Sequence, residues 1–446
     1  MQHLLGGRFR QQVGTTLLTQ VAGLTLTVAT SAIIARWLGP AGKGSLAIAM
    51  LAPGIVSLFL GCGLAVANVY FVGSRRFTVA QLARNSVGFA LVAALAGTAI
   101  ILILRATGWL TRLLPGVPPG IATLTLLTFP IGLVAGYLMS ILQGLQRIFR
   151  INVVNLIQGL LALSAVLVMV VGLELGLLGG VLAYLIAGVA GLLLFAWFVR
   201  REGGDLKPAW ERTVLKPQLA FGLRGYVGNV LQFFNYRFDA FLVNFFLGPA
   251  GVGIYGVSVA LAELLWQFPN AVSFVIFPKA ATTHPEIMNT FTPRVFRITL
   301  GLTFAGALAL AVAGRFLIVL IYGSAFAAAY GPLLALLPGV ALLGGAKVLT
   351  NEIAGRGFPL YNSIASGLGL VVTVVMDLLL IPKYGVMGAS VASSLSYTLI
   401  FLAAIVFYRI ASRHRPLASG TTGAPVYPNA SSGGSPRPQG GGPSVG

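Results

Sequence analysis

The sequence is divided into uncharged apolar runs of about 20 residues or more, separated by short segments that hold most of its charges, prolines and glycines. A run of this length crosses the roughly 30 Å hydrocarbon core of a bilayer as an α-helix. Hydrophobic residues make up 57% of the chain and charged residues only 9%, a composition that excludes an ordinary soluble domain. The chain is therefore predicted to be an all-α polytopic membrane protein.

Charges, prolines and glycines mark the ends of twelve predicted spans. These spans are 13–35, 46–72, 85–104, 121–143, 152–172, 177–199, 219–246, 253–277, 298–314, 332–352, 360–381 and 386–408. We expect an N-terminal six-helix lobe over 1–199, a cytoplasmic linker over 200–217, a C-terminal six-helix lobe over 218–410 and a disordered cytoplasmic tail over 411–446. The tail prediction rests on its Pro, Gly and Ser content.

The net charge of +20 is spread between the spans, so it does not indicate a nucleic-acid partner. With the N-terminus in the cytoplasm, twenty Lys and Arg residues fall on the inner side and six on the outer side. This bias follows the positive-inside rule and predicts an inner-membrane protein with both termini cytoplasmic. One cysteine and three scattered histidines predict no internal disulfide, metal or cofactor.

A short sequence of the first half recurs in the second half. LGPAG at residues 38–42 is repeated at 247–251, and Gly176 is repeated as Gly385, both 209 residues later. Turns between membrane helices also resemble one another by chance, but one offset shared by two regions favours duplication. Six spans return the chain to its starting side, which predicts two homologous lobes of equal orientation around a central cavity.

Polar residues form one stripe on the first predicted helix and one on the seventh. The first stripe includes Gln20 and Thr27. The second, which the same offset relates to the first, consists of Asn229, Gln232, Tyr236 and Asp239. Both stripes are interpreted as substrate-binding walls of the cavity, and contact between packed helices is the alternative.

Charged residues inside the predicted spans are costly, by about 2.5 to 3.5 kcal/mol each on insertion scales. Arg237 and Asp239 are about 200° apart around their helix, so each needs another partner. We interpret Arg237 and Lys347 as binding a substrate phosphate. Asp239, Glu263 and Asp377 are candidates for ion coupling, whereas structural pairs such as Arg237 with Glu263 or Lys347 with Asp377 are the alternative.

Four segments carry a resemblance to a known family. They are ARWLGPAGKGSLAIAM (35–50), NYRFDAFLVNFFLGPAGVGIYGVSVALAE (235–263), IYGSAFAAAYGPLLALLPG (321–339) and IPKYGVMGASVASSLSY (381–397). In these segments the chain resembles the polysaccharide-biosynthesis and oligosaccharide-flippase branch of the multidrug/oligosaccharidyl-lipid/polysaccharide exporter superfamily. The resemblance implies that an undecaprenyl-diphosphate-linked oligosaccharide is moved to the outer leaflet for surface polysaccharide synthesis. It also implies membrane lipids, a polysaccharide polymerase and glycosyltransferases as partners.

The sequence also bears on two other classes of function. A multidrug and toxin extrusion-like cation antiporter also has twelve helices, and the intramembrane carboxylates of the second half leave that reading open. An enzyme is not expected, because no loop is long enough for a catalytic domain. The chain also has no Asp-x-Asp, Gly-x-Ser-x-Gly or phosphate-binding Gly-x-x-x-x-Gly-Lys-Ser/Thr motif.

Overall fold

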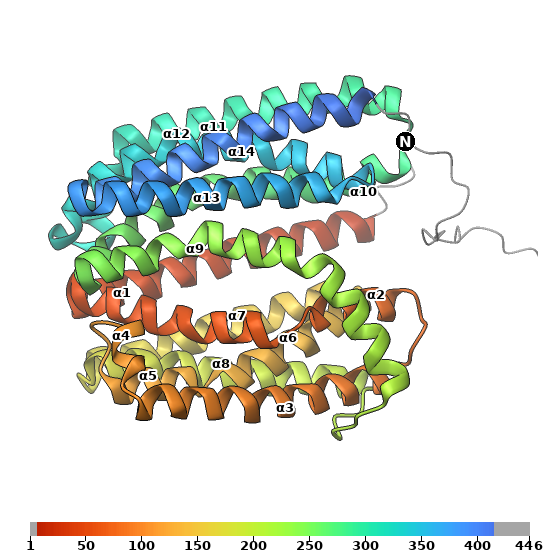
Figure 1. Ribbon diagram of the computed structural model, residues 1–446, viewed down its shortest axis with the longest axis horizontal. Coiled ribbons are helices and arrows are strands. Elements are labelled where there is room, and N and C mark those ends of the chain that lie inside the picture. Colours follow the sequence, from red (N-terminus) through yellow and green to blue (C-terminus); the bar gives the residue numbers. More distant parts are fainter. Residues whose placement is uncertain (1–6, 414–446) are drawn as a thin grey trace, which may run out of the picture. The chain divides into compact units, whose positions relative to one another are not determined.

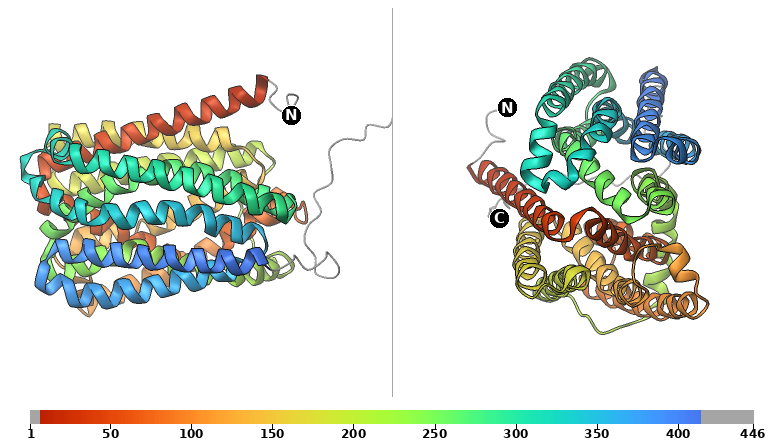
Figure 2. Two further views of the ribbon diagram at one scale, coloured as in Figure 1. Left: turned by 90° about the horizontal axis from the view of Figure 1, so that it is seen from above. Right: turned by 90° about the vertical axis from the view of Figure 1, so that its left-hand side faces the viewer.

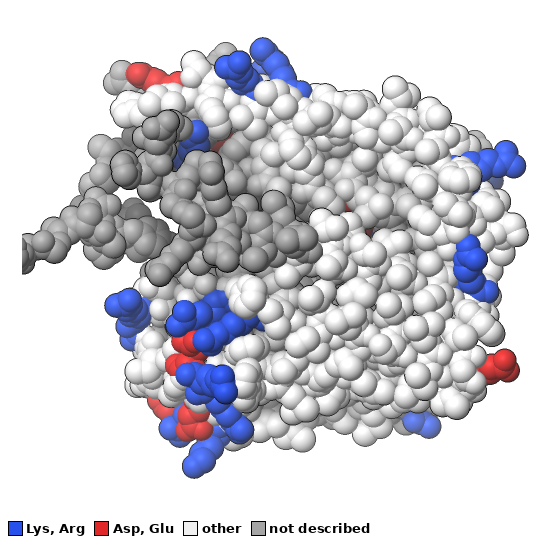
Figure 3. Space-filling view, turned by 180° about the vertical axis from the view of Figure 1, so that it is seen from behind, with Lys and Arg blue, Asp and Glu red and all other residues white. Residues whose placement is uncertain are grey.

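The computed structural model describes residues 7–413, and every regular element in this part is a helix (Figure 1). Ten helical segments among these residues are long and apolar enough to cross a membrane. On the face drawn in Figure 3, charged side chains gather near the two ends of the helices and leave a wide uncharged band between them. The protein is a multi-pass all-α membrane protein, and most of the predicted tail lies outside the described residues.

The helices run along one common direction (Figures 1 and 2). α1 and α9 lie in the middle, and the other helices of the first half and of the second half lie on opposite sides of them. The first half consists of α1 (Gly7–Leu60), α2 (Leu64–Gly73), α3 (Val79–Ala106), α4 (Trp109–Leu113), α5 (Pro119–Leu126), α6 (Phe129–Gly144), α7 (Ile148–Val166), the π-helical turn η2 (Leu167–Gly172) and α8 (Gly176–Arg201). The second consists of α9 (Arg212–Glu263), the 3-10 turn η3 (Leu264–Trp266), α10 (Gln267–Thr282), α11 (Pro285–Tyr322), the 3-10 turn η4 (Ser324–Ala329), α12 (Tyr330–Gly355), α13 (Pro359–Tyr384) and α14 (Val386–Arg413).

Ten segments cover the twelve predicted spans because α1 and α9 each reverse direction. Gly39 has φ 65° and ψ −175°, and Gly248 has φ 71° and ψ −174°, which breaks the helix at both glycines. Lys43 Nζ donates to Ser31 Oγ at 2.6 Å, although 12 residues of straight helix would separate the two by about 18 Å. Each of the two helices is therefore a hairpin of two limbs.

Other predicted boundaries were wrong in detail. The predicted span 46–72 is interrupted between α1 and α2, where Cys62 and Gly63 have φ of 46° and 71°. The predicted span 298–314 is much shorter than α11, because Arg315 does not end the helix. Its side chain is exposed, and a long basic side chain can reach the membrane surface from within a helix.

The two hairpin turns pack against each other at what we call the turn end of the molecule. A β-carbon added to Gly44 would lie 1.7 Å from the carbonyl oxygen of Pro249, and one added to Gly253 would lie 2.0 Å from that of Pro40. Pro249 and Gly253 follow Pro40 and Gly44 by 209 residues. The contact is therefore reciprocal, as at an interface with two-fold symmetry. It also requires glycine, because no side chain fits.

The first turns of α9 pack against the first half. Gln218 Nε2 donates to Asn68 Oδ1 at 2.8 Å, and Tyr226 donates its hydroxyl proton to the carbonyl of Leu58. Further along α9, Asn235 reaches α14 of the second half. The last residues of the predicted linker, 200–217, belong to α9 and not to a loop, so one helix connects the two halves.

A charged cluster ties the start of α7 to the end of α8. Glu202 pairs with Arg147, whose Nε lies 3.0 Å from Glu202 Oε1, and with Arg150. Burial alone would raise the pKa of Glu202, but the hydrogen bonds and charges of the two arginines lower it below its ordinary value. Arg147 and Glu202 lie just outside the membrane-crossing segments Ile148–Gly172 and Gly176–Arg201, and the cluster holds this corner of the first half together.

Candidate functional site

A cavity of about 360 Å³ lies among α9, α10, α12, α13 and α14. Its polar lining consists of Asn229, Gln232, Asn235, Tyr236, Asn270, Lys347, Thr350, Asn351, Asn362, Ser363 and Ser366. Among the described lining residues amides and hydroxyls dominate, none is a carboxylate, and Lys347 is the one charged group. Such a wall both donates and accepts hydrogen bonds at many points, which suits a neutral, hydroxyl-rich ligand.

The cavity brings together part of the predicted site. Asn229, Gln232 and Tyr236 of the seventh-helix stripe line it, as does Lys347. Thr27 does not: its hydroxyl donates to the carbonyl of Gly23 in its own helix. The side chain of Gln20 lies outside the described residues. All described lining residues thus belong to the second half, and Thr27 is not among them.

Lys347 is held by an amide and two aromatic rings. Its Nζ donates to Asn270 Oδ1 at 2.9 Å and lies 4.2 Å from the ring centroid of Trp266 and 5.8 Å from that of Tyr236. The Trp266 ring is fixed in turn, since its Nε1 donates to the carbonyl of Val340 at 3.0 Å. Among the described residues Lys347 makes no ion pair, so the alternative pairing with Asp377 does not occur.

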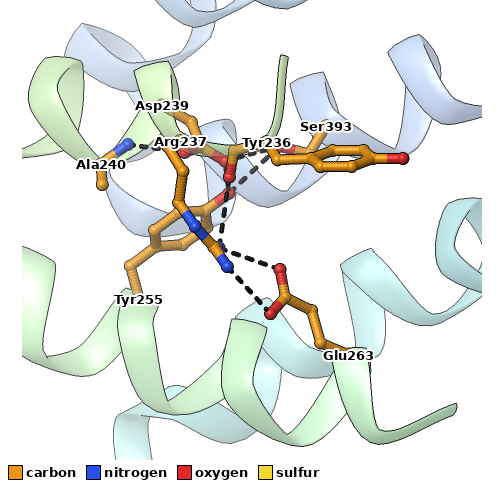
Figure 4. A network of polar contacts seen from close by, with 7 residues as sticks. All are labelled: Tyr236, Arg237, Asp239, Ala240, Tyr255, Glu263 and Ser393. Atoms are coloured by element: carbon orange, nitrogen blue, oxygen red, sulfur yellow. Dashed lines mark hydrogen bonds and ion pairs between the residues drawn. The ribbon is translucent and has the colours of Figure 1, made fainter. Parts of the chain in front are cut away.

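Arg237 and Glu263 form a two-pronged ion pair (Figure 4). Arg237 Nη1 lies 2.9 Å from Glu263 Oε1, and Nη2 lies 3.3 Å from Oε2. The pair joins the two limbs of the α9 hairpin. Its side chains are 36% and 25% exposed, so it is accessible and not sealed in the core.

Asp239 faces a different group of residues, as the 200° separation from Arg237 predicts (Figure 4). Its carboxylate accepts hydrogen bonds from the hydroxyl of Tyr255, from Ser393 Oγ at 3.3 Å and from the backbone N–H of Ala240 at 2.7 Å. These bonds satisfy a carboxylate that is only 3% exposed. They also link α9 to α14.

Asp377 is fully buried in α13, and neither of its carboxylate oxygens accepts a hydrogen bond from any described residue. The hydroxyl oxygen of Thr373, one turn earlier, is also buried and has no hydrogen-bond partner among the described residues. A buried carboxylate without donors is costly unless it is protonated or meets a cation. Of the three predicted coupling residues, Asp377 is therefore the one whose surroundings leave its charge least compensated.

The sequence prediction missed the part of the cavity that α12 and α13 supply. A signal was present: Lys347, Thr350 and Asn351 on α12 recur at helical spacing, as do the polar residues of α13. The missed members are Asn235, Asn270, Thr350, Asn351, Asn362, Ser363 and Ser366. These residues lie outside the two stripes that the 209-residue offset relates.

Comparison with known proteins agrees with this architecture. Residues 33–330 match the family described as polysaccharide biosynthesis protein. The chain is 24% identical over 277 residues to the probable low-salt glycan biosynthesis flippase Agl15 of Haloferax volcanii. That alignment covers 58% of this chain and 55% of the relative, so the chain spans about half the length of that protein.

Two solved structures show the same fold. The lipid II flippase MurJ in an inward closed conformation has a TM-score of 0.73 at 16% identity, covering 89% of this chain and 90% of that one. An inward-facing multidrug resistance MATE family transporter of the MOP superfamily has a TM-score of 0.69 at 16% identity, covering 89% and 97%. At this identity the likeness concerns the arrangement of the helices.

Proposed function

Because the chain belongs to the polysaccharide biosynthesis protein family, a family of membrane flippases and not of enzymes, we propose that it moves a lipid-linked oligosaccharide across the membrane. The proposed substrate is a glycan joined through a diphosphate to undecaprenol, carried from the cytoplasmic to the outer leaflet. Glycosyltransferases are the proposed partners before this step, and a polysaccharide polymerase is the proposed partner after it.

The observation that carries the proposal is the wall of the cavity. Amides and hydroxyls bind sugar hydroxyls, whereas Lys347 on the wall and Arg237, next in the chain to the lining residue Tyr236, supply positive charge for phosphate. Asn229, Gln232 and Tyr236 are the proposed sugar-facing residues. A volume of about 360 Å³ suits one or two sugar rings, while the prenyl chain stays in the lipid.

The proposed architecture consists of twelve crossings in two homologous lobes, residues 1–199 and 218–410, in the inner membrane with both termini cytoplasmic. The two hairpins at equivalent glycines and the reciprocal contact at the turn end support a repeat. The start of the first described helix, α1, and the end of the last, α14, lie at the same end of the molecule (Figure 1), which supports termini on one side of the membrane. One lobe rocking against the other would give alternating access.

The alternative, a multidrug and toxin extrusion-like cation antiporter, is favoured by Asp377, whose buried carboxylate could carry a coupling cation or proton. Ion coupling through Asp239, Glu263 or Asp377 would equally suit a flippase that uses an ion gradient. The absence of carboxylates from the described cavity wall favours a glycan over an organic cation.

The class of substrate is tested in a strain that lacks the protein. Completed lipid-linked oligosaccharide is expected to accumulate in the cytoplasmic leaflet, measured by extraction after labelling of the outer leaflet, and re-expression should relieve it. Unchanged glycolipids together with increased sensitivity to cationic dyes would reject the flippase and support the antiporter.

Filling the cavity should stop translocation without unfolding the protein. Ser366→Trp places an indole into the cavity from α13, and we expect glycolipid export to fall at least about tenfold, because the ring occupies the volume that a sugar would take. Leu368→Trp is the matched control, since Leu368 is 47% exposed on the same helix and does not line the cavity. Equal export by both variants at equal membrane abundance would exclude this cavity as the path.

A further inference from the structure

We propose that Glu263 is an internal stand-in for the phosphate of the substrate. The carboxylate of Glu263 pairs with Arg237. A diphosphate that arrives displaces this carboxylate, and Arg237 and Lys347 then bind the diphosphate together. The inference rests on the proposed function, because it identifies which chemical group of the lipid-linked glycan the second half recognises.

The geometry of the pair is the first argument. Both terminal nitrogens of Arg237 meet both oxygens of Glu263, at 2.9 and 3.3 Å. Two oxygens of a phosphate offer the same fork, so a diphosphate can take the place of the carboxylate without any new arrangement of the guanidinium. The exposure of both side chains gives a ligand access to the pair.

The second argument is an unpaired cation close by. Lys347 lies over Trp266 and near Tyr236, while Arg237 Nη1 also donates to the backbone carbonyl of Tyr236 at 3.3 Å. Both cations thus contact Tyr236, Lys347 at its ring and Arg237 at its backbone carbonyl, and of the two only Arg237 has an ion-pair partner among the described residues. A diphosphate carries more than one negative charge and could engage both cations, whereas Glu263 pairs with Arg237 alone.

The other nearby carboxylate is not available for this exchange. Asp239 is buried and already accepts hydrogen bonds from Tyr255, Ser393 and the Ala240 backbone. Moving the Asp239 carboxylate away would leave these buried donors without a hydrogen-bond acceptor. Among the described residues Arg237 is the one side chain that donates to Glu263, so Glu263 is the carboxylate that an anion can displace at the smaller cost.

Displacement would also change how the helices are joined. Arg237 and Glu263 belong to the two limbs of α9, and Glu263 immediately precedes η3, the turn that ends at Trp266. Releasing Glu263 removes the ion pair between the limbs, while the Trp266 ring under Lys347 stays held by its hydrogen bond to Val340. Binding of the anion would therefore loosen the second half at the place where it is recognised.

The test uses the purified full chain in detergent and inorganic pyrophosphate as the probe, with affinity measured by isothermal titration calorimetry. Glu263→Gln should bind pyrophosphate roughly tenfold more tightly than the unaltered protein, because the neutral amide competes weakly for Arg237. Arg237→Gln and Lys347→Gln should each bind at least about tenfold more weakly. Glu174→Gln, which changes an exposed acid far along the chain in the loop before α8, should bind as the unaltered protein does.

Unchanged or weaker binding by Glu263→Gln would overturn the proposal. If that variant does not fold, Glu263→Asp serves instead, since the shorter side chain cannot reach both nitrogens and should give a smaller gain in affinity. Pyrophosphate contains no sugar, so this result is independent of the strain experiment. Leaflet accumulation without a gain in Glu263→Gln would reject the stand-in alone, whereas a gain in affinity without leaflet accumulation would reject the flippase alone.

Discussion

Gly253→Ala is expected to force the two hairpin turns apart. The added methyl group would lie 2.0 Å from the carbonyl oxygen of Pro40, a backbone atom that cannot rotate away. Gly44→Ala should have the same effect from the other side, because its methyl group would lie 1.7 Å from the oxygen of Pro249. Overpacking of this kind costs about 1 to 3 kcal/mol or more, and we expect the turn end to open and export to stop.

Opening of the turn end is measured with a cysteine placed at Ser45 in a Cys62→Ser background. Ser45 is 7% exposed and donates to the carbonyl of Gly116 at 2.9 Å, so the new thiol should be protected unless the turns separate. A membrane-impermeant maleimide is expected to label it in both alanine variants. Gly54→Ala and Gly256→Ala are the matched controls, one on each hairpin, because outside the adjoining backbone of the same helix no atom lies within 4 Å of either added methyl group. Labelling of all four variants to the same extent would reject the tight contact.

Arg237→Ala is expected to abolish glycolipid export while membrane abundance stays close to normal. Truncating one partner of a buried charge pair with a ligand costs about 2 to 5 kcal/mol, which is roughly a 30-fold to several thousand-fold loss of affinity. The partly exposed Glu263 left behind can be hydrated, so the folding penalty should be smaller than the loss of binding. Export is measured by the leaflet assay, and abundance by immunoblotting of the membrane fraction.

A double variant separates binding from structural pairing at this site. Arg237→Ala combined with Glu263→Ala leaves neither charge unpaired, so any loss of abundance in the single variant should be restored. Export should remain absent, because the guanidinium is still missing. Normal export by the double variant would show that the pair is structural. Arg105→Ala, an exposed arginine at the end of α3, should export normally in the same assay.

Much of the fold could be predicted because the membrane imposes one length on every span. Apolar runs identified most helices, and the repeated LGPAG sequence coincides with the glycines at which α1 and α9 reverse. Helix ends were less predictable, since a lone charge such as Arg315 can reach the surface from inside a helix. The break between α1 and α2 at Cys62 and Gly63 results from positive backbone φ angles, and no charge or proline in the sequence predicts it.

The site was predictable only along a single helix. Helical spacing placed Asn229, Gln232 and Tyr236 on one face, and the cavity confirms that they share a wall. Which residues of α12 and α13 complete that wall depends on how helices pack, a property that periodicity within one helix does not contain. The same limit applies to charges: the pair of Arg237 with Glu263 forms only because the hairpin brings residues 26 positions apart together.

The reciprocal glycine–proline contact has the form of an interface between two copies of one chain. A six-helix ancestor would have needed only that single self-complementary turn to dimerise. Fusion of the two copies would then have relieved them of the need to stay identical. Within the described residues, every carboxylate inside a span and every residue of the polar cavity lies in the second half, which is the distribution that such a division of labour would produce.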